Sequence, residues 1–132
     1  MTNAELIILL KKEYNTFNDY WFKPCGGLHI SRSIYLKGNT TIESLPDNLT
    51  AGLHLWLENC INLKTLPKNL KVGVNLNLRN CKSLTTIPED IFVKGDLVLD
   101  NCLLHPFGEL KVLGNIKGSY NIIQNSKNFI ID

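Results

Sequence analysis

Four cysteines and three histidines are the residues of this chain best suited to act as nucleophiles, bases or metal ligands. Nucleophilic catalysis requires a cysteine or serine beside a histidine that a third group orients. His29, His54 and His105 fall at unrelated positions, and His54 is expected to face away from Cys60. Zinc sites usually need close pairs such as C-x-x-C, which this sequence lacks, and no phosphate-binding glycine loop occurs. We therefore expect no catalytic residues, no metal site and no cofactor.

Three of the cysteines, Cys60, Cys81 and Cys102, recur every 21 residues. The same register holds for four short apolar segments: Ile34-Tyr-Leu36, Leu55-Trp-Leu57, Leu76-Asn-Leu78 and Leu97-Val-Leu99. A fixed period in this range is typical of a solenoid, in which each repeat forms one coil that cannot bury its apolar face alone. Since these cysteines share the register of core leucines, we expect buried, reduced thiols, with disulfides between coils or a soft metal as alternatives. Cys25 lies outside the register and is expected to be exposed.

Each repeat begins with a segment that alternates between apolar and polar residues, most clearly over 53–58. Because side chains alternate along a strand, this pattern predicts three residues facing the core and three facing outward. The inward residues are Leu53, Leu55 and Leu57; the outward residues are His54, Trp56 and Glu58. The Leu66-Pro67 pair disfavours helix, so the far side of each coil should be extended or a short 3₁₀ turn. Gly52, Gly73 and Gly95 should permit the tight return into the next strand.

The chain before the repeats predicts a helix from residue 3 to about 22, capped by Thr2 or Asn3. We expect this helix to cover the open end of the first coil, although a membrane-surface or partner-binding helix is an alternative. Pro24-Cys-Gly-Gly27 should end it, and Leu28-His-Ile30 should form a short strand. The single domain over 1–132 then divides into an N-terminal cap (1–24), four to five coils (25–118) and a C-terminal cap (119–132). The fourth coil is irregular after Cys102, and a fifth strand should begin about two residues early, at Ile116.

The repeated pattern Leu-x-Leu-x-x-Cys-x-x-Leu-x-x-Leu-Pro resembles a leucine-rich repeat, in the variant with cysteine where asparagine is common. The residues that carry the resemblance are Leu55, Leu57, Cys60, Leu63, Leu66 and Pro67, followed by Leu76, Leu78, Cys81, Leu84, Ile87 and Pro88. It covers residues 31 to 118 and departs from the usual pattern at Gly52, Gly73 and Asn39. The resemblance implies an α/β-type solenoid arc with a parallel sheet on its concave side, which most members of the family use to bind proteins.

The composition limits the possible partners and location of this 132-residue chain. A net charge of +2 with scattered basic residues argues against a nucleic-acid surface. The N-terminus lacks the basic region of a signal peptide, and its apolar run is too short to span a membrane. We therefore expect a soluble, cytoplasmic protein of the producing or host cell, with no membrane partner, and a monomer rather than an oligomer.

The outward strand positions offer the best candidates for a binding surface, because parallel strands in register place equivalent positions side by side. Tyr35 and Trp56 should be neighbours, followed by Asn77 and Val98 in the same column. Exposed aromatic residues dominate binding hot spots, although a cap folded over the pair is an equally open alternative. A second column alternates in charge and predicts a ladder of salt bridges or a charged binding stripe: Lys37, Glu58, Arg79 and Asp100.

These features favour a non-enzymatic module that binds a protein partner through the concave face of the solenoid. The predicted contact residues are Tyr35, Trp56, His54, Lys37, Glu58, Asn77 and Arg79. A small free-standing unit of this kind suits a phage or bacterial inhibitor or effector. The alternative is a structural or assembly component that oligomerises through the ends of the solenoid.

Overall fold

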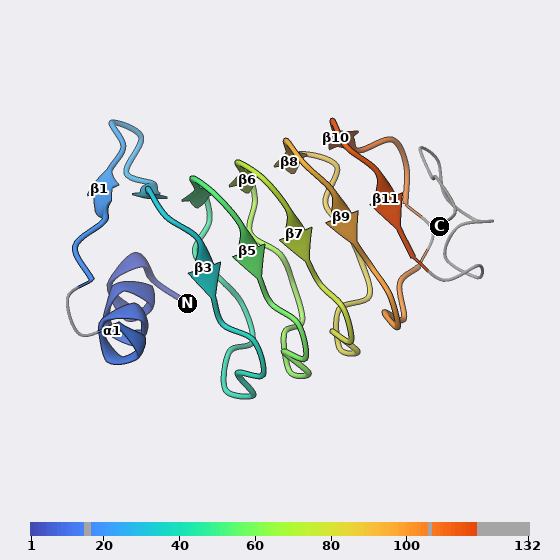
Figure 1. Cartoon of the computed structure of the whole chain (residues 1–132), viewed down its shortest axis with the longest axis horizontal. Helices are drawn as coiled ribbons and strands as arrows, with labels where there is room; N and C mark the ends of the chain where they lie inside the picture. Colours follow the sequence, from blue (N-terminus) through green and yellow to red (C-terminus); the bar gives the residue numbers. More distant parts are fainter. Residues whose placement is uncertain (15–16, 106, 119–132) are drawn as a thin grey trace.

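The computed structural model describes residues 1–14, 17–105 and 107–118, and these form a parallel β-solenoid with one helix at the N-terminal end (Figure 1). Hydrogen bonds join residues 21 positions apart in successive coils, for example at Ser33 and His54. Each coil contributes one short strand to each of two sheets; in Figure 1 the strands of one sheet run side by side across the middle, and those of the other lie along the upper edge of the coils. The solenoid predicted from the repeat spacing is therefore confirmed.

The five-stranded sheet is formed by the alternating segments of the repeats, and all its neighbouring strands are parallel. Its strands are β3 (Ile34–Tyr35), β5 (Leu55–Trp56), β7 (Leu76–Asn77), β9 (Leu97–Val98) and β11 (Ile116–Lys117). Ile116 pairs with Leu97, which confirms that the last strand begins two residues early. The two-residue length of each strand means that stability comes from neighbouring coils rather than from any strand alone.

The six-stranded sheet lies on the far side of the coils. Its strands are β1 (Tyr20–Phe22), β2 (Leu28–Ile30), β4 (Thr50–Ala51), β6 (Lys71–Val72), β8 (Phe92–Val93) and β10 (Lys111–Val112). β1 pairs with β2 in antiparallel fashion, and every other neighbouring pair is parallel. The far side is thus extended, one of the two conformations expected, and the described residues contain no 3₁₀ helix.

The core fills the space between the two sheets with leucine, isoleucine, valine and cysteine side chains. Leu55 and Leu57 are fully buried, as the alternation predicts, whereas Trp56 between them is only partly buried. The prediction for Leu53 is wrong, because its side chain is 47% exposed. β5 begins only at Leu55, so Leu53 belongs to the bend between β4 and β5 and the strand alternation does not reach it.

One corner of each coil uses the left-handed backbone conformation. The residues at this corner are Gly38, Asn59, Asn80 and Asn101, with φ angles of 73°, 60°, 61° and 59°. Asparagine tolerates this region better than other residues with a side chain, and glycine adopts it without cost. The chain then turns inward, and the N–H of Cys60 donates to the carbonyl of Leu57. The corner therefore sets the direction from which each cysteine enters the core.

Gly73 lies at the tight return from β6 into β7, as expected, and the structure shows why a glycine is needed there. The described residues with positive φ include Gly26 and Gly38 but not Gly73, so it does not serve a left-handed turn. Instead, a Cβ atom at Gly73 would collide with the carbonyl oxygen of Gly52 in the preceding coil. The glycine thus permits the close approach of two backbones, since the Gly73 N–H also donates to the Ala51 carbonyl at 2.8 Å.

The N-terminal helix is shorter than predicted. α1 (Asn3–Glu13) begins with a capping box, in which Thr2 and Glu5 each accept a backbone N–H from the other. The expectation that the helix reaches residue 22 is wrong, because Tyr20–Phe22 forms β1 and pairs with Leu28–Ile30. Strand pairing through the turn at Gly26, which has a φ of 87°, replaces the helix that the aromatic spacing suggested. α1 contributes Leu6, Ile7 and Leu10 to the core at this end.

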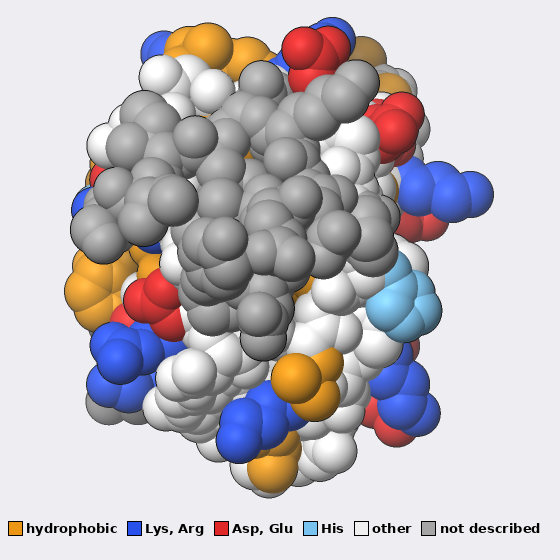
Figure 2. Space-filling model, turned by 90° about the vertical axis from the view of Figure 1, so that its right-hand side faces the viewer, with side chains coloured by type: hydrophobic (Ala, Val, Ile, Leu, Met, Phe, Trp, Pro, Cys, Tyr) orange, Lys and Arg blue, Asp and Glu red, His pale blue; other side chains and the backbone are white. Residues whose placement is uncertain are grey.

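The C-terminal coil is completed by residues outside the repeat register. Phe107 and Leu110 are buried where the leucine pattern fails after Cys102. Around the rim of this end of the molecule, hydrophobic side chains lie between charged ones of both signs (Figure 2). The C-terminal cap expected over 119–132 lies outside the described residues. None of the described helices has the length and apolar content needed to cross a membrane.

Candidate functional site

The outward face of the five-stranded sheet brings the predicted aromatic residues together. Tyr35 pairs in register with Trp56, and Trp56 pairs with Asn77. The rings of Tyr35 and Trp56 meet edge to face, with centroids 5.1 Å apart and an interplanar angle of 87°. This is a favourable arrangement for an aromatic pair. The adjacency predicted from strand parity is therefore confirmed.

The aromatic pair is accessible from outside. Tyr35 is 42% exposed and Trp56 is partly exposed. α1 lies beside the first coil in Figure 1 and does not overlap β3 or β5. His54 extends the cluster, because its ring centroid lies 5.9 Å from that of Trp56. Three rings from two neighbouring coils thus form one partly exposed group, which we call the aromatic cluster (Tyr35, His54 and Trp56).

The charged column beside the aromatic cluster forms only in part. Lys37 Nζ lies 3.7 Å from Glu58 Oε2, while Glu58 Oε1 accepts a hydrogen bond from Asn77 Nδ2 at 2.6 Å. The prediction of a continuous salt-bridge ladder is wrong, because the Arg79 guanidinium has no ion-pair partner among the described residues. Glu58 is already held by Lys37 and Asn77, and exposed pairs stabilise by only about 0.2–1 kcal/mol. Arg79 therefore remains next to the cluster as an exposed cation.

A third column of equivalent positions, which begins at the buried Ser33, has a structural role that the sequence did not indicate. One side chain in each coil accepts the backbone N–H of the next coil: Ser33 from His54 at 3.1 Å, His54 Nδ1 from Asn75 at 3.3 Å, Asn75 from Asp96 at 2.8 Å and Asp96 from Asn115 at 2.9 Å. These four bonds form a side-chain ladder along the edge of the sheet. The sequence feature that these four residues share is a hydrogen-bond acceptor in the side chain at the same position of each repeat.

The ladder fixes the chemical form of His54. Because Nδ1 accepts the Asn75 N–H, this nitrogen carries no proton and Nε2 carries it when the ring is neutral. His54 therefore presents Nε2–H, a hydrogen-bond donor, beside the aromatic cluster. The residue contributes both to the framework and to the chemistry of the surface.

The three cysteines of the repeat lie in the core, as predicted, and Cys25 is exposed. Each buried thiol donates to the carbonyl oxygen of a strand-end leucine in the preceding coil: Cys60 to Leu36, Cys81 to Leu57 and Cys102 to Leu78, at 2.9 to 3.1 Å. Burial raises the pKa of all three thiols, to about 12 for Cys81 and about 11 for Cys102. Thiols with such pKa values are poor nucleophiles at neutral pH.

The histidines stand apart from these thiols. His29 stacks on Trp21 with ring centroids 3.8 Å apart, and burial together with nearby Lys23 lowers the pKa of His29. His105 is exposed in the irregular fourth coil. Within the described ranges, no group of three potential His, Cys, Asp or Glu ligands is placed to hold a metal ion.

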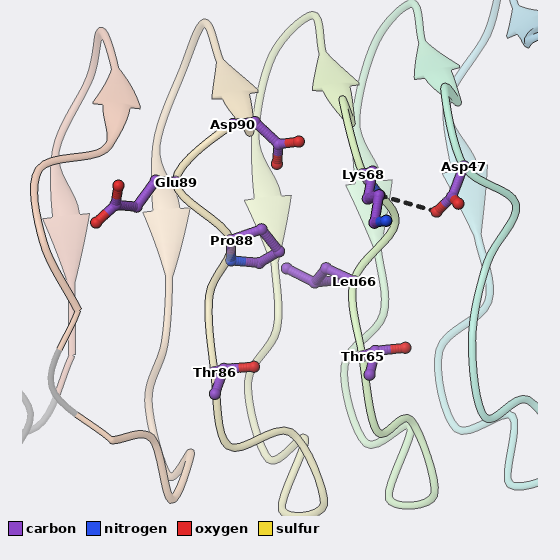
Figure 3. A pocket seen from close by; sticks show the side chains of 8 residues that line it. All are labelled: Asp47, Thr65, Leu66, Lys68, Thr86, Pro88, Glu89 and Asp90. Carbon is purple, nitrogen blue, oxygen red and sulfur yellow. Dashed lines mark hydrogen bonds between the residues drawn. The ribbon is translucent and has the colours of Figure 1, made fainter.

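A hollow of about 680 Å³ lies on another side of the coils (Figure 3). Its lining consists of Asp47, Thr65, Leu66, Lys68, Thr86, Pro88, Glu89 and Asp90. Two of the carboxylates are engaged with backbone: Asp47 accepts the N–H of Lys68 at 2.9 Å, and Asp90 accepts that of Asn69 at 3.1 Å. Through these hydrogen bonds Asp47 and Asp90 join neighbouring coils.

The fold defines the class of the protein. It is a short parallel β-solenoid with turns of about 21 residues, a buried cysteine in successive repeats and an N-terminal helix. Comparisons with protein-family models, with curated proteins and with solved structures find no match to this chain.

Proposed function

We propose that this solenoid is a non-enzymatic module, of the leucine-rich-repeat type that its sequence resembles, which binds a protein partner. The observation that carries the proposal is the aromatic cluster, in which Tyr35 and Trp56 remain accessible on a sheet. Aromatic side chains on a rigid surface provide large apolar area and lose little rotamer entropy on binding. Polar groups of the kind found at the rim of a protein interface lie beside the cluster: Lys37, Glu58, Asn77 and Arg79.

The test compares recovery of partners by the wild-type chain and by Trp56→Ala, using affinity purification with mass spectrometry followed by binding measurements on each candidate. Truncation of a central aromatic hot spot should weaken binding by about 2 kcal/mol or more. Ile61→Ala is a matched control, because Ile61 is an exposed apolar residue at a corner away from the cluster. Equal binding by wild type and Trp56→Ala, combined with lower stability of the variant, would refute the proposed site.

We further propose a reducing, cytoplasmic location and a role as an inhibitor or effector acting on a host protein. The support for the location is the donor role of the three buried thiols, since each needs its proton to bond a leucine carbonyl. The support for the role is the accessible aromatic cluster on the described five-stranded sheet.

A second candidate function is assembly through the N-terminal end of the solenoid. β1 is the terminal strand of the six-stranded sheet, and its residues Trp21 and Phe22 are 51% and 57% exposed. Edge strands with exposed apolar residues can pair with another chain. Light scattering after size exclusion distinguishes the two functions, because a monomer at high concentration argues against assembly.

A further inference from the structure

A hollow of about 450 Å³ lies over the outward face of the six-stranded sheet, opposite the five-stranded sheet that carries the aromatic cluster. Its lining residues are Asn69, Lys71, Asp90, Phe92 and Lys111. This volume falls within the range of about 300–1,000 Å³ that is usual for small-molecule sites. The lining combines one aromatic ring, two ammonium groups and one carboxylate, and these groups limit the kinds of ligand that the hollow could bind.

Strand register places the aromatic residue between the two cations. Phe92 pairs with Lys71 on one side and with Lys111 on the other. Neighbouring strands lie about 4.8 Å apart, so the two lysine Cα atoms are separated by about 10 Å. On the opposite face of the same strands, Val72 and Val93 are buried in the core. The three outward side chains therefore stand on a fixed base, with the half-buried ring of Phe92 in the middle.

Both ammonium groups are available to a ligand. Lys37, Lys64 and Lys117 form ion pairs elsewhere, whereas neither Lys71 nor Lys111 has a carboxylate within ion-pair distance in the described part of the chain. Two cations on either side of a ring suit an anion, and lysine is a common phosphate ligand.

The carboxylate at the edge adds a directional acceptor. Asp90 Oδ2 accepts the Asn69 N–H at 3.1 Å, which orients the carboxylate and leaves Oδ1 for a donor from outside. Asn69 is held in turn, because its Nδ2 donates to Asn48 Oδ1 at 3.0 Å. A hydroxyl or amino group of the ligand would satisfy Asp90 Oδ1.

We propose that this hollow is a binding site for a nucleoside phosphate. The base stacks on the ring of Phe92, the ammonium groups of Lys71 and Lys111 donate to the phosphate, and a ribose hydroxyl donates to Asp90. Stacking of a base on an aromatic side chain is favourable for every base, so the site is selective for the combination of ring and phosphate rather than for one base. The site is independent of the protein-binding surface, because it lies on the other sheet.

The first experiment is calorimetric titration of the full chain at low salt with AMP, adenosine and ribose 5-phosphate. The proposal requires AMP to bind at least about tenfold more tightly than either fragment, because only AMP uses the ring and the cations together. Equal affinity for AMP and ribose 5-phosphate would overturn it and show a simple anion site. Equal affinity for AMP and adenosine, or no AMP binding at millimolar concentration, would also overturn it.

The second experiment uses variants. Lys71→Ala and Lys111→Ala should each weaken AMP binding about tenfold and reduce its salt dependence. Lys82→Ala is the matched control, since Lys82 is an exposed lysine outside the hollow and its loss removes the same charge. Phe92→Leu keeps the apolar volume while removing the ring, so it should weaken AMP binding and leave ribose 5-phosphate unaffected. An effect of Lys82→Ala as large as that of Lys71→Ala would refute the proposed location.

Discussion

Ser33, His54, Asn75 and Asp96 differ in size and charge, yet each accepts a backbone N–H from the coil that follows. The repeat thus selects an acceptor atom at this position rather than a residue type. An apolar substitution in the ladder would leave a partly buried N–H without a partner, which costs about 1–3 kcal/mol. His54 carries this framework role in addition to its place in the aromatic cluster, so a His54 variant alone cannot separate binding from stability.

The buried thiols lead to a prediction on reactivity and on pH dependence. Native protein should be labelled by a thiol reagent chiefly at exposed Cys25, because labelling requires the thiolate and burial raises the pKa of Cys81 to about 12. In the unfolded chain the thiols titrate near 9.0, so between pH 9.0 and about 12 the folded state binds more protons than the unfolded state. Their contribution to stability is complete below pH 9.0 and falls above it, by up to about 1.4 kcal/mol per pH unit for each thiol.

Urea unfolding below and above pH 9.0, for wild type and Cys81→Ala, measures this contribution. The variant should be less stable near neutral pH, because it loses the sulfur atom and its bond to the Leu57 carbonyl, and its stability should fall less steeply with rising pH. Rapid labelling of all four cysteines in the native protein, or equal pH slopes for the two proteins, would contradict the burial of these thiols.

The elements of this fold are too short to be stable alone. Apart from β1 and β2, every strand in the described part of the chain has two residues, and each pairs with the equivalent segment of a neighbouring coil. The turns between the strands therefore determine much of the fold. Some positions in them require the left-handed backbone conformation, and others require close contact between two backbones. These two requirements can be separated by substitution.

Gly38→Asn and Gly73→Ala should have opposite effects. Gly38 has a φ of 73° with open space around the Cβ position, and asparagine already occupies the equivalent corner at 59, 80 and 101. Gly38→Asn should thus be neutral or stabilise by up to about 1 kcal/mol, by restricting the unfolded chain. Gly73→Ala should destabilise by about 2 kcal/mol or more, since its Cβ meets the Gly52 carbonyl. Thermal and chemical unfolding of both variants tests the pair, and similar effects of the two would refute this distinction.

The inward and outward positions of the five-stranded sheet could be predicted, because alternation around Leu55, Trp56 and Leu57 leaves only one possible parity. The six-stranded sheet could be predicted only at Leu28–Ile30 and as an extended far side, since strands such as Thr50–Ala51 are too short to show any periodicity. The length of α1 was overestimated because aromatic residues up to Tyr20 also fit helical spacing, and pairing of β1 with β2 prevails over that local signal.

The candidate site, like the fold, could be predicted only in part. The contact between Tyr35 and Trp56 follows from strand register. The charged ladder does not follow, because weak exposed pairs depend on side-chain conformation, and Asn77 binds Glu58 instead. The role of Ser33 could not be predicted, because a serine hydroxyl has many possible partners; in the structure it is buried and accepts the His54 N–H.

At the scale of the whole molecule, the described solenoid is a series of interfaces between adjacent coils, and its first coil has another coil on one side only. At the N-terminal end, α1 and β1 cover the first coil and bury Leu6, Leu10 and Phe17 against it. We therefore expect the thermal stability and the solubility of the protein to depend on α1 and β1.

Deletion of residues 1–22 should expose the apolar edge of the first coil, including Leu28 and Ile30, so the truncated protein should aggregate or melt at a lower temperature. Light scattering and thermal unfolding measure these outcomes. The double variant Trp21→Ala and Phe22→Ala is the control, because it removes exposed aromatic residues while keeping the cap. A truncated protein that remains monomeric and equally stable would identify α1 as a detachable binding element.

The direction of the inter-coil hydrogen bonds also determines how the molecule responds to mechanical force. In both sheets these bonds run along the axis of the solenoid, from one coil to the next. A pull on the two ends therefore opens them coil by coil instead of shearing many at once. Each opened coil releases the 21 residues between equivalent positions, an extension of about 7 nm at about 3.3–3.6 Å per residue. The solenoid should thus yield at low force in regular steps and behave as an extensible spacer.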